Sequence, residues 1–322
     1  MSPLVNLQDA ASDRDKVQSA AERFRIEVVT DDGEMFTRAF DMLDGFFGPK
    51  GELEPRADLA RFTRDPVLSF GDGMEGHYRL IVALDGDELV GVRDCYVDLD
   101  RNAGVCIAAL SHSFVAPSQR RSGLAALFRT VPVTLARTLA TQHLGPSAPV
   151  LVAAEMEPVD PDDIDSIVRL LAYSRSGFSV MDPARLPYSQ PDFRDLLALG
   201  AEHTALPLMP VVRWVGSEDS PSLPVPLAAA FARLFHACHR LYLPRERVDP
   251  SEVHALRALA RQVDPVRLLP LPRDMSQIGL LAPLLRSAVL PLYPRILQGS
   301  NPEFRDAAAE LARLLARLPG DT

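Results

Sequence analysis

Two adjacent arginines and a glycine form the part of this sequence best suited to chemistry. They lie in residues 113–127, SFVAPSQRRSGLAAL, after an apolar run and before a segment whose apolar residues recur every three or four positions. We interpret residues 103–114 as a strand that ends at Ala116-Pro117, and the later segment as a helix that begins near Gly123. A loop that joins a strand to a helix in this way is suited to hold a phosphate group.

The start of the helix near Gly123 explains why this loop would bind a phosphate group. Its first backbone N–H groups have no partner within the helix, and the helix dipole places partial positive charge there, so an anion is favoured. Gln119, Arg120 and Arg121 add polar groups and charge. Gly123 would let the backbone approach a ligand because it carries no Cβ. A pyrophosphate fits this loop, whereas the alternative for the loop alone is a surface turn with two solvated arginines.

At these residues the chain resembles the GCN5-related N-acetyltransferase (GNAT) family, whose acyl-CoA signature is Arg/Gln-x-x-Gly-x-Gly/Ala. Residues 120–125, RRSGLA, match that signature. Residues 173–178, YSRSGF, resemble the family's Tyr-x-x-x-Gly-Phe, and the two motifs follow in the family's order. Both motifs belong to a stretch, about 24–216, that resembles the GNAT fold over nearly its whole length.

The resemblance implies that acetyl-CoA, or another acyl-CoA, is the cofactor. In the family the pantetheine arm pairs with the strand before the loop, which makes Val115 the central residue of that contact. The residues expected to bind the cofactor are Phe114, Val115, Ala116, Gln119, Arg120, Arg121, Ser122, Gly123, Leu124 and Ala125.

Transfer of an acyl group from a thioester to an amine needs a base for the amine and a proton for the departing thiolate. The resemblance points to Tyr173 as the proton donor, and a tyrosine packed on its helix is the alternative. Glu155 is our candidate base because it directly follows the apolar strand 150–154, where the paired strands of this fold diverge. Glu157, His112 and ordered water are the competing bases, and a strand-end carboxylate that faces water is the structural alternative.

The fold class we predict is α/β, with a mixed central sheet of the GNAT type followed by an all-helical C-terminal domain. Helical spacing or caps predict helices at 13–23 and 36–47, from 123 to about 144, and from Asp160. Strands are expected at 24–30, 78–84, 88–98, 103–114, 150–154 and 206–215.

The chain divides into four parts on this reading. They are an N-terminal tail and helix (1–23), a GNAT-like acyltransferase domain (24–216), a Ser/Pro-rich linker (217–224) and a helical C-terminal domain (225–322). The sequence leaves three roles open for the last part: it could cover the acceptor cleft, mediate a homodimer or bind a partner.

Composition limits the partners. A net charge of −9 argues against nucleic acid, since phosphate neutralisation needs a basic surface. Prolines and Arg286 interrupt the long apolar run at 277–297, so we expect no membrane span. Three scattered cysteines and the lack of a secretion signal favour the cytoplasm. His236, Cys238 and His239 have no second pair of ligands at useful spacing, so we assign no metal.

These features favour an acyl-CoA-dependent N-acyltransferase that acts on a primary amine of a small molecule or a protein, by direct transfer in a ternary complex. The alternative is a catalytically inactive GNAT-fold module that senses acyl-CoA or binds another protein. Pro132, within the helix that follows the loop, is a departure that leaves room for this alternative.

The phosphate-binding assignment predicts that Arg120→Ala and Gly123→Glu weaken coenzyme binding and leave the fold intact. Arg120→Ala removes a charge that would pair with a phosphate, and Gly123→Glu adds a like charge beside it. Calorimetric titration with acetyl-CoA and free CoA measures both effects. Unchanged affinity in both variants would show that the loop does not bind the phosphates.

Overall fold

The computed structural model describes residues 2–156, 164–191, 208–274 and 276–278. Its helices are η1 (Leu7–Asp13), α1 (Arg14–Arg23), α2 (Glu34–Phe47), η2 (Gly48–Lys50), α3 (Arg56–Arg64), η3 (Pro117–Gln119), α4 (Leu124–His143), α5 (Ile164–Arg175), α7 (Val225–His239) and α8 (Arg245–Ala260). Its strands are β1 (Arg25–Val29), β2 (Val67–Gly71), β3 (Met74–Asp85), β4 (Glu88–Asp100), β5 (Val105–Val115), β6 (Val150–Met156), β7 (Ser179–Met181), β8 (Met209–Trp214), β9 (Ser222–Leu223) and β10 (Val266–Pro270).

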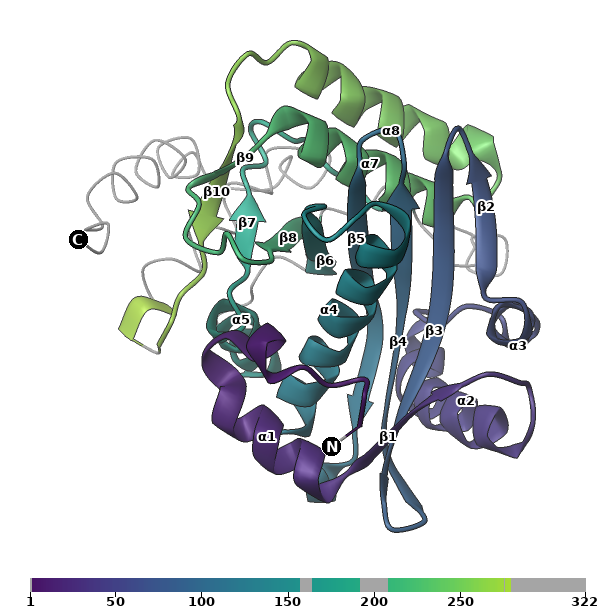
Figure 1. The fold of residues 1–322 in the computed structure, drawn as a ribbon. Helices are drawn as coiled ribbons and strands as arrows, with labels where there is room; N and C mark the ends of the chain where they lie inside the picture. The colour runs from purple at the N-terminus through teal and green to yellow at the C-terminus, as the bar shows by residue number, and fades with distance from the viewer. Residues whose placement is uncertain (1, 157–163, 192–207, 275, 279–322) are drawn as a thin grey trace, which may run out of the picture.

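One mixed sheet runs through the described chain in the order β1-β3-β4-β5-β6-β8-β7-β10-β9, with β2 paired to β3. β5 and β6 are parallel, and α4 makes the crossover between them. Their pairing runs from Cys106↔Val150 to Leu110↔Ala154 and then stops, although β5 continues to Val115 and β6 to Met156. The two central strands therefore diverge at their carboxyl ends, as the sequence predicted. Figure 1 shows the long strands of this sheet between two layers of helices.

The alternation of side chains along the strands assigns each helix to one face of the sheet. One face, which we call the α4 face, packs against α1, α4 and α5. The other, the α7 face, packs against α2, α3, α7 and α8. Along β6, for instance, Val152 and Ala154 belong to the α4 face and Leu151 and Ala153 to the α7 face.

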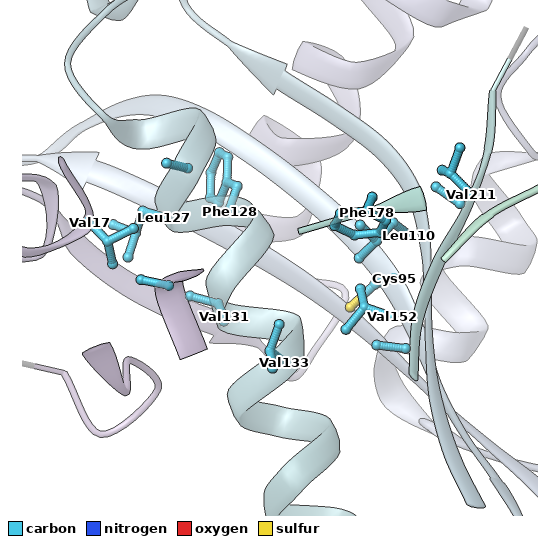
Figure 2. Close-up of a cluster of buried hydrophobic side chains, with 14 of the residues drawn as sticks. Val17, Cys95, Leu110, Leu127, Phe128, Val131, Val133, Val152, Phe178 and Val211 are labelled. Atoms are coloured by element: carbon cyan, nitrogen blue, oxygen red, sulfur yellow. The ribbon is translucent and has the colours of Figure 1, made fainter. Parts of the chain in front are cut away.

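The core of the α4 face brings α1 and α4 onto the middle of the sheet. Figure 2 shows Val17 of α1 near Leu127 and Val131 of α4, while the strand residues Cys95 and Val152 lie on the other side of α4, near Leu110 and Phe178. Pro132 lies inside α4, which nevertheless runs as one helix of 20 residues.

Residues expected to form a polar tail instead pack along α4. Asp9 is fully buried, and its carboxylate accepts a hydrogen bond from Thr134 Oγ1 (3.0 Å) and pairs with Arg137 Nε (2.9 Å). Ser12 donates a hydrogen bond to the carbonyl of Arg175 at the end of α5. The N-terminal segment thus bridges α4 and α5.

The region after residue 216 is partly helical, as predicted, but it also joins the sheet. α7 and α8 match the expected helices, whereas β9 lies within the predicted linker and β10 pairs with β7. The expectation of a wholly helical region is wrong for β10. Its short run Val266–Pro270 completes the edge that β7 would otherwise leave open. The predicted last helix, from about residue 301, lies outside the described residues.

None of the described helices is long and apolar enough to span a bilayer.

A carboxylic acid is buried beneath α7. Asp98 of β4 is fully buried, and Cys238 Sγ donates a hydrogen bond to its Oδ2 at 3.3 Å. Burial raises the pKa of Asp98 from 3.8 to about 8, and the Cys238 contact only partly opposes this. The folded chain therefore keeps a proton at neutral pH that the unfolded chain releases.

The raised pKa predicts that Asp98 makes the protein less stable as pH rises. Its contribution to the free energy of unfolding is fully present below about pH 4 and is lost by about pH 8, at up to about 1.4 kcal/mol per pH unit. Asp98→Asn should remove this dependence on pH. Urea denaturation should therefore find that the free energy of unfolding of the variant rises relative to that of the wild type as pH rises. Asp87→Asn, at an exposed turn residue, is the control and should follow the wild type. The raised pKa would be contradicted if the wild type and Asp98→Asn differed in free energy of unfolding by the same amount at every pH.

Candidate functional site

The loop between β5 and α4 has the geometry of an anion-binding turn. η3 covers Pro117–Gln119, and Gly123 takes a left-handed conformation (φ +86°) as the N-cap of α4. The first helical bond joins Leu127 N–H to Gly123 O (3.0 Å), which leaves earlier amides of the first turn without a helical acceptor. The side chains of Arg120 and Arg121 are exposed. The N–H of Leu124 donates to Ser122 Oγ at 3.3 Å, so the first-turn amides that have no helical acceptor and follow it are those of Ala125 and Ala126, close to the two exposed arginines.

The strand residues before this loop lie where β5 has lost β6 as a partner. Phe114 turns to the α7 face, with its ring 5.5 Å from that of Phe46, while Val115 packs on the α4 face. Val115 pairs with Gly91 of β4 on the other side, and Ala116 N–H donates to Val90 O. The edge of residues 114–116 that faces away from β4 is therefore the one open to pantetheine pairing.

Gly123 faces α1. A Cβ built there would lie 2.5 Å from the carbonyl oxygen of Lys16 and 3.4 Å from Cβ of Ala20. The glycine is required because α1 packs directly on the loop, in addition to its positive φ. The expectation that Gly123→Glu would leave the fold intact is therefore wrong, and Arg120→Ala is the better probe of the loop.

A β-bulge turns His112 towards the α7 face. In β5, Leu110 is opposite Cys95 and Ser113 is opposite Arg93, so two residues face Asp94 alone. Without the bulge His112 would share the α4 face with Leu110, whereas its ring in fact packs 4.8 Å from the ring of Phe47 in α2. The bulge is held by the backbone N–H of His112, which donates to Asp94 Oδ1 at 2.7 Å.

His112 is the centre of a buried polar cluster on this face. Its Nε2 donates to the carbonyl of Glu52 (2.7 Å), and its Nδ1 lies 3.3 Å from Asp94 Oδ1 and 3.7 Å from Glu54 Oε2. Tyr78 Oη donates to Asp94 Oδ2 at 3.3 Å. Burial alone would lower the pKa of His112, but the charge and hydrogen bond of Asp94, with Glu54, raise it to about 10. Burial raises the pKa of Glu54 to about 7, partly opposed by the charge of His112.

Glu155 lies on the diverging end of β6 and also points to the α7 face. Tyr188 Oη donates to its Oε1 at 2.5 Å, and Gln190 Nε2 donates to its Oε2 at 2.9 Å. His239 Nε2, from the end of α7, lies 3.6 Å from Oε1. Two donors thus fix the orientation of this carboxylate, and a residue of the C-terminal region approaches it.

Tyr173 lies on the other face. It is half-buried against the α4-face core, and its ring meets that of Phe178 edge-on at 4.9 Å. Gly177, with φ +82°, ends α5, because Phe178 N–H bonds to Tyr173 O and Gly177 N–H bonds to Ser174 O. The Tyr-x-x-x-Gly-Phe motif therefore forms a helix end that presents Tyr173 beside the α4 core.

The remaining sequence candidates are separated. Glu157 lies outside the described residues. His236 Nδ1 donates to Ala232 O, Cys238 faces Asp98 and His239 faces Glu155, so these three do not converge. The sequence analysis missed Glu54, Asp94 and Tyr188. Alternation along β4 could have placed Asp94 on the face of Tyr96, but no local pattern joins Glu54 or Tyr188 to the site.

A cavity of about 480 Å³ lies elsewhere in the described structure. It is bordered by the C-terminal half of α4, the start of β6 and Trp214. The phosphate-type loop is at the opposite end of α4, about 30 Å away for a helix of this length.

The solved structures that the chain resembles are GNAT-type acetyltransferases, the family that the sequence motifs indicated. They include an acetyltransferase from Streptococcus agalactiae (TM-score 0.35, 13% identity, 60% of this chain and 99% of that chain). A diaminobutyrate acetyltransferase from Paenibacillus lautus, solved with its substrate and coenzyme A, has a TM-score of 0.31 and 14% identity, over 59% of this chain and 95% of that chain.

A GCN5-related glucosamine N-acetyltransferase region of a fungal multi-domain β-N-acetylglucosaminidase has a TM-score of 0.33 and 17% identity. That match covers 49% of this chain and 17% of the fungal one. No family model and no curated protein matches the chain. With TM-scores this low, an assignment of function has to rest on the chain's own loop, strand divergence and side chains.

The contact between Gly123 and α1 predicts a large cost for a single methyl group. Gly123→Ala should lower the free energy of unfolding by about 2–4 kcal/mol, from about 1 kcal/mol for the left-handed backbone and about 1–3 kcal/mol for overpacking. Gly86→Ala is the matched control, since Gly86 has φ +62° with nothing within 4 Å of its added Cβ. Urea denaturation of the two variants measures the difference. An equal loss of free energy of unfolding in the two variants would show that α1 can shift to accommodate the methyl group at no energetic cost.

Proposed function

We propose that this protein is an acyl-CoA-dependent N-acyltransferase that transfers an acyl group, most simply acetyl, to a primary amine. The observation that carries the proposal is the position of the Arg120–Gly123 loop. It opens onto the first turn of α4 at the point where β5 and β6 diverge, and Glu155 stands on the diverging end of β6. The loop proposed to bind phosphate and the carboxylate of Glu155 thus lie at the same end of the two central strands.

The loop and the open edge of β5 would hold the coenzyme. Arg120 and Arg121 would pair with phosphates, and the backbone at residues 114–116 would pair with the pantetheine arm. The bound acyl-CoA supplies a thioester whose carbonyl carbon accepts the amine. The divergence of β5 from β6 gives the acyl end a route between the two faces of the sheet.

Glu155 would act as the base. As the amine nitrogen bonds to the acyl carbon, Glu155 takes a proton from that nitrogen, and the bond from carbon to sulfur then breaks. Tyr188 and Gln190 keep the carboxylate in one orientation through their hydrogen bonds. Tyr173, on the α4 face, would return a proton to the thiolate, which balances the transfer.

The acceptor would approach from the α7 face, where Glu155 lies. A carboxylate there favours a neutral or cationic group over an anionic one, so a primary amine, which attacks in its neutral form, suits this side of the sheet. The Paenibacillus protein acts on a diamine, 2,4-diaminobutyric acid, which has the same functional group.

The test separates binding from transfer. Wild-type protein should bind acetyl-CoA in calorimetry and acetylate members of an amine panel. Glu155→Gln should keep the coenzyme affinity and lower kcat by about 10²–10⁴-fold, the usual effect of losing a general base. Tyr188→Phe should lower kcat less, and Glu88→Gln, at an exposed carboxylate of β4, should match the wild type.

Two outcomes would contradict the proposal. Absence of binding to both acetyl-CoA and CoA would mean that the loop has a structural role. Binding without turnover on any amine would favour the module that senses acyl-CoA.

A further inference from the structure

Three ligand-type atoms from three separate segments converge on the α7 face. They are Glu54 Oε2 from the loop before α3, Asp94 from the middle of β4 and His112 Nδ1 from the bulge of β5, all within 4.8 Å of one another. The side chains are 18%, 1% and 12% exposed. Because they are largely buried and come from distant parts of the chain, their convergence is a product of the tertiary fold.

The distances from His112 Nδ1 to the two carboxylates are longer than those of short charge-assisted hydrogen bonds. His112 Nδ1 lies 3.3 and 3.4 Å from the two oxygens of Asp94 and 3.7 Å from Glu54 Oε2, whereas charge-assisted bonds close to about 2.7–2.9 Å. The same sheet contains a direct comparison, since His77 Nε2 and Glu75 Oε1 approach to 2.7 Å. Glu54 Oε2 is buried and has no hydrogen-bond partner among the described residues.

The spacing does fit ligands around a small cation. Zinc binds imidazole and carboxylate at about 2.0–2.2 Å, and ligands at tetrahedral angles are then about 3.3–3.6 Å apart. Octahedral ligands at the same bond length would be closer, at about 2.8–3.1 Å. Two of the three ligand pairs, those from His112 Nδ1 to each carboxylate, are near the tetrahedral values, and the third pair, Glu54 with Asp94, lies within 4.8 Å.

The surroundings orient the three groups as metal sites require. The carbonyl of Glu52 can only accept, so Nε2 of His112 carries a hydrogen and Nδ1 is the atom left to coordinate. Asp94 is held by the backbone N–H of His112 and by Tyr78 Oη. The ring of Phe47 covers the imidazole. With Nδ1 bound to an ion the imidazole is neutral, so a divalent cation would displace the proton that His112 otherwise carries there, and its charge would offset the two carboxylates.

We propose that Glu54, Asp94 and His112 form a binding site for a divalent cation of the zinc class, with the fourth tetrahedral position left for water or another ligand. The ion joins the loop before α3 to β4 and to the bulge of β5. Spacing along the sequence could not reveal this site, because the ligands are 40 and 18 residues apart. The proposal does not depend on acyl transfer, since metal binding is measured without a coenzyme.

The experiment measures zinc on the full chain after removal of any histidine tag. Protein stripped with a chelator and dialysed against zinc should retain about one equivalent by mass spectrometry of the metal, and zinc should raise its Tm. Substitution with cobalt should give the visible absorption of a tetrahedral site. His112→Gln and Glu54→Gln should each weaken zinc binding by about 100-fold or more.

The control is His77→Gln, which removes a buried histidine that is paired with a carboxylate on the same sheet. It should retain zinc. Glu54→Gln lies in a loop, so it keeps the test decisive if His112→Gln fails to fold. Two results would overturn the proposal: a wild type that holds less than about a tenth of an equivalent, and zinc binding that survives Glu54→Gln unchanged.

Discussion

The bulge in β5 is the local constraint on which the polar face of the site depends. One extra residue opposite Asp94 reverses the alternation of the strand, and His112 then points to the face where Glu54 and Asp94 lie. A regular strand would have placed the imidazole against the apolar core of the α4 face, without partners. The backbone N–H of His112 binds Asp94, so the group that creates the bulge is also part of the cluster.

The two faces of the sheet then serve different chemistry. The α4 face has the loop, the start of α4 and Tyr173, and the ion pair of Arg129 with Asp13 lies close to Tyr173. The α7 face holds the carboxylates, and its cover comes partly from the C-terminal region, where His239 approaches Glu155 and the hydroxyl of Tyr242 meets that of Tyr96. The C-terminal region therefore forms part of the wall of the site.

The sequence was informative where local pattern determines structure. The loop, α4 and the helix end at Gly177 could be predicted, because apolar periodicity, glycine and proline act over a few residues, whereas the divergence of β5 and β6 was implied by the resemblance to the GNAT family. The short strands β2, β7, β9 and β10 were missed, since their pairing partners decide them. Contacts such as Tyr188 to Glu155 span 33 residues without a local signal. The reason for Gly123 was also misjudged. The glycine was expected to make room for a ligand, whereas its missing Cβ makes room for α1, whose position depends on the packing of the whole fold.

The N-terminal segment has a consequence for how the chain acquires its structure during synthesis. Arg213 of β8 donates a hydrogen bond to the carbonyl of Asp9 at 2.6 Å, a contact between residues 204 positions apart. Segments this distant meet late, because closing a long loop costs entropy before any contact forms. η1 leaves the ribosome before β8, so it gains this partner only after β8 has emerged. Its contacts with Thr134 and Arg137 of α4 can form earlier in synthesis, so the N-terminal segment is attached to α4 first and to β8 afterwards.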